Sequence, residues 1–99
     1  MAAKFLQIHP AALAELKAAV IWYQERNQTA ANNFVSEVDR VLELVIAAPA
    51  RWPKGKHGTR KLVLQRYPFA VIYREKETLV QVLAVAHGRR RPGYWEDRL

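Results

Sequence analysis

The sequence predicts an α+β fold in which an antiparallel helical hairpin packs on a three- to four-stranded, mostly antiparallel sheet, with the order β-α-α-β-β-β. In the first half, two long segments repeat apolar residues every three or four positions, as one face of a helix does. The second half holds three short apolar segments of strand length, separated by turn residues. A chain of 99 residues, 51% of them apolar, suits one packed domain over residues 1–99.

The first elements are a short strand over Phe5–Ile8 and a helix over Ala11–Arg26. Pro10 suits the first helical turn, because its missing N–H costs nothing there, and His9 then stands at the N-cap. The apolar face of this helix consists of Leu13, Leu16, Val20 and Tyr23, widened by Ala19 and Trp22.

The second helix follows after a short break at Asn27-Gln28, which makes the two helices an antiparallel hairpin. Thr29 is the expected N-cap, and the apolar pattern continues through Ala47. Pro49 then ends the helix, because the residue before a proline disfavours helical geometry.

The remaining chain alternates turn segments with strands. The expected loops and turns are Arg51–Thr59, Tyr67-Pro68 and Glu75–Thr78. The expected strands are Lys61–Arg66, Phe69–Arg74 and Leu79–Ala86, followed by a basic and aromatic tail over His87–Leu99. The segment Leu79–Ala86 is almost entirely apolar, which predicts a central strand covered on both faces. Tyr73 continues the apolar face of its strand and is expected in the core.

The net charge of +7 lies entirely in the second half of the chain. Residues 1–50 have a net charge of −1 and residues 51–99 a net charge of +8, with seven cations and no acid over Arg51–Arg74. This segregation indicates a face that binds an anionic partner.

Composition also narrows the class of protein. The absence of cysteine excludes disulfides and thiolate chemistry and fits a reducing cytoplasm. No apolar run reaches the ~20 residues of a membrane span, and the opening residues are too polar for a signal peptide. The three histidines lack metal-ligand spacing, so we expect neither a metal nor another cofactor.

Four segments of the chain have a distinctive combination of residues. They are Glu25-Arg26-Asn27, the Ala/Asn-rich start of the second helix with Phe34, Phe69–Tyr73, and the basic stretch Val85–Arg91. Together with the element order β-α-α-β-β-β, these segments resemble the ParE/RelE superfamily of toxins from bacterial type II toxin–antitoxin systems. The resemblance covers nearly the whole chain. It implies a small basic toxin that a cognate, acidic antitoxin neutralises, with oligomers formed mainly with that antitoxin. RelE-like members cut messenger RNA, usually on the ribosome, whereas ParE-like members inhibit DNA gyrase without chemistry of their own.

The resemblance supplies a ribonuclease pattern that this sequence matches only in part. The matching positions are Lys61, Arg89, Arg91 and Tyr94, with His87 as a further proton-transfer candidate or a half-buried histidine that closes the sheet. Val63, Gln65 and Ala70 stand at positions where such an enzyme places cations. The missing cations favour a ParE-like toxin that binds its target, most readily DNA gyrase. The alternatives are a RelE-like, metal-independent endoribonuclease and a non-toxic basic nucleic-acid-binding module.

The candidate residues for binding the target or the antitoxin are mostly cations. They are Lys54, Lys56, Arg60, Arg66, Arg89, Arg90, Arg91 and Trp95. The cations suit phosphates or carboxylates rather than base reading, since no groove-reading motif is present. Trp95 either packs on the helices or offers its ring to a base or a peptide. Trp52 is expected to anchor the loop before Pro53, and His57 to lie at the surface.

Overall fold

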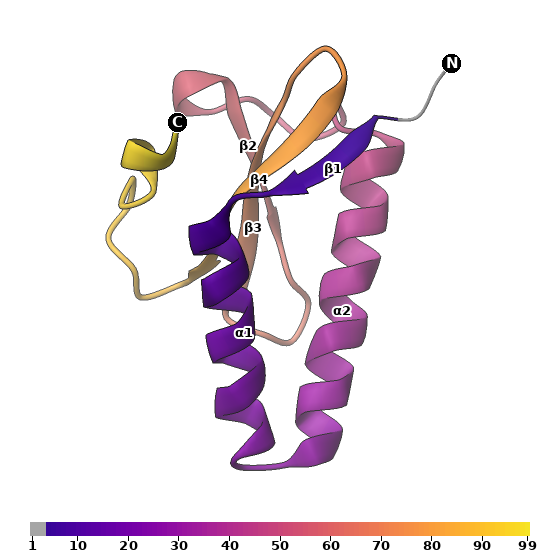
Figure 1. Ribbon diagram of the computed structural model, residues 1–99, viewed down its shortest axis with the longest axis vertical. Coiled ribbons are helices and arrows are strands. Elements are labelled where there is room, and N and C mark those ends of the chain that lie inside the picture. The colour runs from indigo at the N-terminus through magenta and orange to yellow at the C-terminus, as the bar shows by residue number, and fades with distance from the viewer. Residues whose placement is uncertain (1–3) are drawn as a thin grey trace.

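A computed structural model describes residues 4–99 as a helical hairpin lying on one face of a four-stranded sheet (Figure 1). Residues 1–3, part of the start considered above for a signal peptide, lie outside the described residues. The strands are β1 (Phe5–Ile8), β2 (Thr59–Val63), β3 (Phe69–Glu75) and β4 (Leu79–His87), and the helices are α1 (Pro10–Gln24) and α2 (Gln28–Ala47). Short 3₁₀ turns lie at Lys56–Gly58 and Glu96–Arg98. The predicted element order and fold class are confirmed.

Local side-chain contacts set the helix ends. His9 is the N-cap of α1, as predicted, and its Nδ1 accepts a hydrogen bond of 3.0 Å from the backbone N–H of Ala11. The prediction of Thr29 as the cap of α2 is wrong: Asn27 is the N-cap, and its Oδ1 accepts from Ala30 N–H at 3.1 Å. Asparagine is at least as good an N-cap as threonine, so the helix begins earlier. Neither helix, nor any other within residues 4–99, is long and apolar enough to cross a membrane.

The sheet has the strand order β1-β4-β3-β2. The pairs β2–β3 and β3–β4 are antiparallel, whereas β1 runs parallel to β4, with Phe5 opposite Leu79 and Ile8 opposite Val82. The last long strand therefore lies inside the sheet, which confirms the prediction of a central strand. β1 pairs with only the first four residues of β4, and α1 then leaves the edge of the sheet.

The second strand lies about two residues earlier in the chain than predicted. β2 covers Thr59–Val63 rather than Lys61–Arg66, and its register with β3 sets Lys61 opposite Ile72. The ladder ends early because Arg66 has a left-handed backbone, with φ 68°, and because the N–H of Gln65 turns to the Glu37 carboxylate of α2 at 2.6 Å. These are tertiary and turn effects that apolar alternation alone does not encode.

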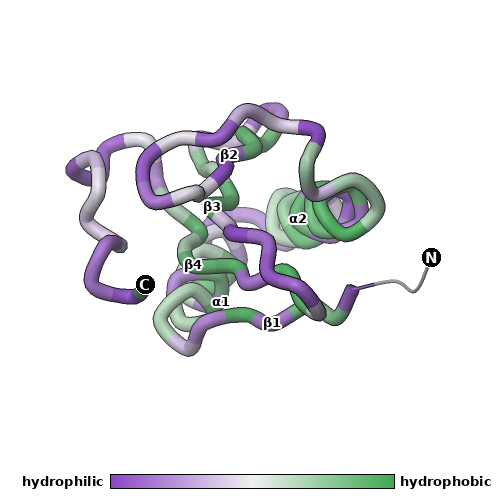
Figure 2. Tube along the Cα trace, turned by 90° about the horizontal axis from the view of Figure 1, so that it is seen from above, coloured by the Kyte–Doolittle hydropathy of each residue, from purple (hydrophilic) through white to green (hydrophobic). Residues whose placement is uncertain are grey.

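Buried side chains lie on both faces of the sheet. The larger core packs α1 and α2 on one face, around the fully buried residues Phe34, Val41, Val71, Tyr73 and Val82. A smaller core lies on the opposite face, where Trp95 of the C-terminal segment packs on Ile72, Leu83 and Ala84. Figure 2 shows hydrophobic residues concentrated in the helices, β3 and β4, and a mostly hydrophilic C-terminal segment.

Tyr73 confirms its predicted core position and also makes a polar contact. The ring is 0% exposed, and its hydroxyl donates to the carbonyl of Pro49 at 2.7 Å, where the chain leaves α2. We expect Tyr73→Phe to lower the free energy of unfolding by about 1–2 kcal/mol, since the half-buried carbonyl of Pro49 loses its donor. Urea denaturation measures this loss. Tyr67→Phe is the matched control, because the Tyr67 hydroxyl lies 3.3 Å from the Ala30 carbonyl and the side chain is only half-buried. Equal losses in the two variants would contradict the prediction.

Candidate functional site

A cavity of about 580 Å³ lies on the sheet face opposite the helices, between β2, β3, β4 and the C-terminal segment. We call it the outer-face cavity. The predicted site residues that line it are Lys54, Arg60, Lys61, His87, Arg90, Arg91, Tyr94 and Trp95. Among residues 4–99, no aspartate or glutamate lines it. Two segments distant in the sequence, 53–61 and 86–95, thus bring their cations to one hollow that attracts anions.

Three predicted residues lie outside this cavity. Lys56, Arg66 and Arg89 are exposed and are absent from its lining. Arg66 lies in the turn after β2, where its charge acts on the Glu37 carboxylate. The basic run at residues 89–91 is therefore divided, with Arg90 and Arg91 at the cavity and Arg89 outside it.

Two of the residues that line the cavity, Arg60 and Trp95, make contacts that stabilise the fold. The guanidinium of Arg60 donates to the carbonyls of Ala50 and Trp52, so it fastens the loop after α2 to β2. Trp95 is only 8% exposed and packs on the sheet, not on the helices as one of the two interpretations had it. We therefore leave the side chains of Arg60 and Trp95 out of the binding surface.

Lys61 projects from the outer face of the sheet, where its partner on β3, Ile72, is apolar. Lys61 and Val63 alternate with the inward-facing Leu62, and Val63 pairs with Ala70 of β3. The side chain of Val63 is 57% exposed. The positions beside Lys61 thus carry apolar side chains, which supply no charge to stabilise a phosphorane.

His87 lies at the end of β4, half-buried, as predicted from its place in the sequence. Its Nδ1 accepts a hydrogen bond of 3.0 Å from the backbone N–H of Arg89, and its ring meets Phe69 edge-on with centroids 5.0 Å apart. Because Nδ1 accepts, the neutral ring carries its proton on Nε2. The imidazole thus helps to fix the turn after β4 while its ring lines the cavity.

Tyr94 reaches the cavity with its ring, but its hydroxyl is engaged elsewhere. It donates to Glu15 Oε2 of α1 at 2.7 Å. Burial, with the hydrogen bond to Glu15 adding to it, raises the pKa of Tyr94 to about 12. A phenol with this pKa and a carboxylate partner is poorly matched to proton transfer near neutral pH.

Glu15 is the residue that sequence reasoning missed. Its carboxylate accepts the Tyr94 hydroxyl, the backbone N–H of Val85 at 3.1 Å, and both Nη atoms of Arg98 at 2.9 and 3.0 Å. We call Glu15, Tyr94 and Arg98 the Glu15 cluster. Arg98 also donates to the carbonyl of Leu83 at 3.0 Å. These side chains supply hydrogen bonds to β4 beyond the point where β1 stops pairing with it, and they fasten the C-terminal segment there.

Burial is the largest single influence on the Glu15 carboxyl and raises its pKa. The hydrogen bonds from Arg98, Tyr94 and Val85 together outweigh it, so the pKa of Glu15 lies below its ordinary value. The signal in the sequence is that α1 carries only two charged residues, Glu15 and Lys17. An acid on such an apolar helix is a candidate for an internal ion pair.

Besides the Glu15 cluster, an exposed contact holds the C-terminal segment. His57, in the loop before β2, lies 2.5 Å from Glu96 through its Nε2, and both side chains are more than 40% exposed. The contact links the loop to the C-terminal segment. His57 is at the surface, as predicted. Among residues 4–99, no group of three or more His, Asp and Glu side chains could hold a metal ion.

A second, smaller cavity of about 400 Å³ lies between α1 and the ends of β3 and β4. We call it the helix-side cavity. Ala18, Ala19 and Trp22 of α1 form one wall, and Phe69 and Val85 of the sheet form the other. It is mostly apolar, and it shares His87, Arg90 and Tyr94 with the outer-face cavity.

The family model and the solved structures that match this chain all describe toxins or toxin–antitoxin systems. Residues 6–92 match the family model described as the ParE toxin of the type II toxin–antitoxin system, parDE. A solved structure of the chromosomal ParDE toxin–antitoxin system from P. aeruginosa aligns with a TM-score of 0.73 at 23% identity, covering 85% of this chain and 95% of that one. Among curated proteins, none matches the sequence.

Two solved structures of E. coli toxin RelE, both of a double arginine-to-alanine mutant, are also similar. The free toxin aligns with a TM-score of 0.60 at 19% identity, covering 89% of this chain and 86% of that one. The toxin in complex with an antitoxin RelBc peptide aligns with a TM-score of 0.52 at 20% identity, covering 97% and 95%. At these identities, the structural likeness establishes a shared fold.

Proposed function

The chain belongs to the ParE toxin family of type II toxin–antitoxin systems, and on that premise we propose that it arrests growth by binding DNA gyrase through the outer-face cavity and is neutralised by a cognate antitoxin. The observation that supports the proposal is a cation-lined cavity in which the Tyr94 hydroxyl and the Arg60 guanidinium are already engaged by other groups of the fold. Lys61, Arg90 and Arg91 attract an anionic partner, and no acid among the described residues opposes them there.

Several side chains at and beside this cavity support binding rather than cleavage. Metal-independent RNA cleavage needs a base, an acid and cations around the crowded phosphate. The Tyr94 hydroxyl is bound to Glu15 and has a pKa of about 12. Val63 and Ala70 are apolar where the outer face would need cations, and Arg60 is bound to backbone carbonyls. Binding without turnover is the function that this arrangement supports best.

A RelE-like endoribonuclease remains the second candidate because of one observation. Lys61, His87 and Arg91 line the same cavity, and His87 has a nitrogen, Nε2, that the Arg89 hydrogen bond leaves unused. In this alternative, His87 takes part in proton transfer and Lys61 and Arg91 neutralise the phosphate. The two candidates predict opposite outcomes in assays with purified protein.

We expect the purified toxin to inhibit gyrase supercoiling and to leave ribosome-bound message intact. We further expect Arg90→Ala with Arg91→Ala to raise the concentration needed for half-inhibition by about tenfold or more, because two charge-assisted contacts are lost. The matched control removes the same charge at Lys17 and Lys76, which are exposed and line neither cavity. The control variant should inhibit as the parent does. Message cleavage that the double arginine variant abolishes, with supercoiling unaffected, would establish the ribonuclease instead.

A further inference from the structure

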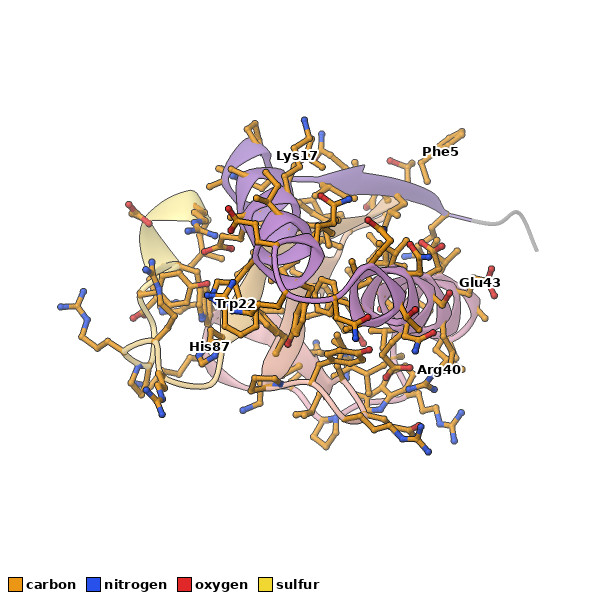
Figure 3. The ribbon with its side chains drawn as sticks, turned by 90° about the horizontal axis from the view of Figure 1, so that it is seen from below. Phe5, Lys17, Trp22, Arg40, Glu43 and His87 are labelled. Atoms are coloured by element: carbon orange, nitrogen blue, oxygen red, sulfur yellow. The ribbon has the colours of Figure 1, made fainter. Side chains whose placement is uncertain are left out.

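The helix-side cavity has the character of a receptor for one large apolar side chain. Its small residues Ala18 and Ala19 leave the hollow open, and the aromatic ring of Phe69 and the side chain of Val85 close its far wall. About 400 Å³ is near the lower end of the ~300–1,000 Å³ range of ligand pockets. Trp22, which is 50% exposed, and His87 both line this cavity, and Figure 3 shows these two side chains near each other.

The two cavities adjoin at the end of β4, and we call them together the path. His87, Arg90 and Tyr94 line both of them, whereas Arg91 and Lys61 line only the outer-face cavity. The path begins apolar and ends cationic. The one acid that lines it among residues 4–99, Glu15, is already neutralised by Arg98 at 2.9 Å.

We propose that this path binds an extended acidic segment of the antitoxin, with one large aromatic or aliphatic side chain in the helix-side cavity and neighbouring carboxylates in the outer-face cavity. The inference rests on the proposed neutralisation by an antitoxin. Charge complementarity argues for this occupant, because cations line the outer-face cavity and the chain has a net charge of +7. A buried apolar anchor supplies most of the affinity, and guanidinium–carboxylate pairs fix the direction of the segment.

The geometry gives neutralisation a direct physical basis. A segment anchored beside Trp22 places its carboxylates on Arg90, Arg91 and Lys61, the cations that the proposed function assigns to the target. Antitoxin and target then compete for the same charges. No change in the toxin fold is required for this competition.

Fluorescence anisotropy with a labelled peptide and the full chain tests the site without gyrase. The probe contains one tryptophan next to a run of glutamates, prepared in both orders, and the tighter order is used. One comparison peptide has serine in place of tryptophan, and another has glutamine in place of glutamate. We expect each change to weaken binding by about tenfold or more.

Paired variants locate the two halves of the site. Ala18→Trp fills the helix-side cavity, so this variant should bind the tryptophan and serine peptides equally. Ala14 is exposed one turn earlier and lines neither cavity, so the Ala14→Trp control should keep the preference for the tryptophan peptide. Arg90→Glu should abolish the preference for glutamate, and Arg89→Glu, beside it but outside both cavities, should preserve it.

The possible failures are distinguishable from failure of the proposed target. Absence of a preference for tryptophan or for glutamate in the parent protein overturns the bipartite site, whatever happens to gyrase. Equal effects of Ala18→Trp and Ala14→Trp, or of Arg90→Glu and Arg89→Glu, overturn it as well. Selective peptide binding by a toxin that leaves gyrase unaffected supports this site and overturns the target.

Discussion

Glu15→Gln is expected to lower the free energy of unfolding by about 2–3 kcal/mol and to loosen the C-terminal segment. The carboxylate accepts hydrogen bonds from Arg98, from the Tyr94 hydroxyl and from the backbone of Val85. A glutamine keeps one acceptor oxygen, but the NH₂ group that replaces the other oxygen can only donate. It cannot accept a hydrogen bond from the donors that surround this side chain. Hydrogen bonds to charged groups are worth about 1.5–3 kcal/mol each, and the carbonyl of Leu83 also depends on the position of Arg98.

The loss of unfolding free energy in Glu15→Gln should be larger at neutral pH than at acidic pH. The pKa of folded Glu15 lies below its ordinary value, so its carboxylate contributes stability above the unfolded pKa of about 4.3. That contribution falls as the pH drops through the folded pKa. The difference between the parent protein and Glu15→Gln should therefore be largest near neutral pH and should shrink as the pH drops below about 4.

Urea denaturation across this pH range measures the effect on stability, and limited trypsin digestion at Arg89 and Arg90 reports the loosened segment. Glu43→Gln is the control, because Glu43 is exposed on α2 and forms none of the ion pairs found within residues 4–99. A pH-independent loss in Glu15→Gln, or equal loss in the control, would show that the Glu15 cluster does not hold the segment.

Phe34→Ala should cause the largest loss of stability among these variants, about 3–5 kcal/mol. Phe34 is 0% exposed, and its ring centroid lies 5.1–5.3 Å from those of Tyr23, Tyr67 and Phe69. Truncation leaves a cavity where α1, α2 and the sheet meet, and three rings lose a packing partner. The total free energy of unfolding of a domain is only about 5–15 kcal/mol, so this single loss is a large fraction of it.

Circular dichroism during urea denaturation measures this loss. Val35→Ala, at the neighbouring position of α2 and 40% exposed, is the control and should cost less than 1 kcal/mol, on the order of other surface changes. If Phe34→Ala does not fold, Phe34→Leu gives a smaller measurable step at the same place. A loss no greater than that of Val35→Ala would contradict the proposed role of this ring.

Local pattern predicted most of the fold correctly. The apolar residues repeated every three or four positions predicted both helices and their hairpin. The continuous apolar run of Leu79–Ala86 predicted a central strand. The bounds of β2 escaped prediction, since they depend on the left-handed Arg66 and on the capture of the Gln65 N–H by Glu37. The first is a local turn conformation, and the second is a contact between elements that lie far apart in the sequence.

The site was less predictable because charge alone does not reveal which way a side chain points. Lys61, Arg90 and Arg91 do line one cavity, but Arg60, equally basic, is bound to the carbonyls of the loop after α2. Trp95 was ambiguous between core and surface, and its 8% exposure assigns it to the core. Glu15 lies in the first half of the chain, outside the basic segments that hold the net positive charge.

The parallel pairing of β1 with β4 has a consequence for synthesis on the ribosome. Phe5 pairs with Leu79, a residue made 74 positions later, so the first strand has no partner while most of the chain is still being translated. Contacts of such long sequence separation also slow folding, since the loop must close before they form. A nascent chain that ends before β4 contains neither a completed sheet nor the cations at residues 90 and 91. The charged face therefore becomes available only when translation has passed the last strand.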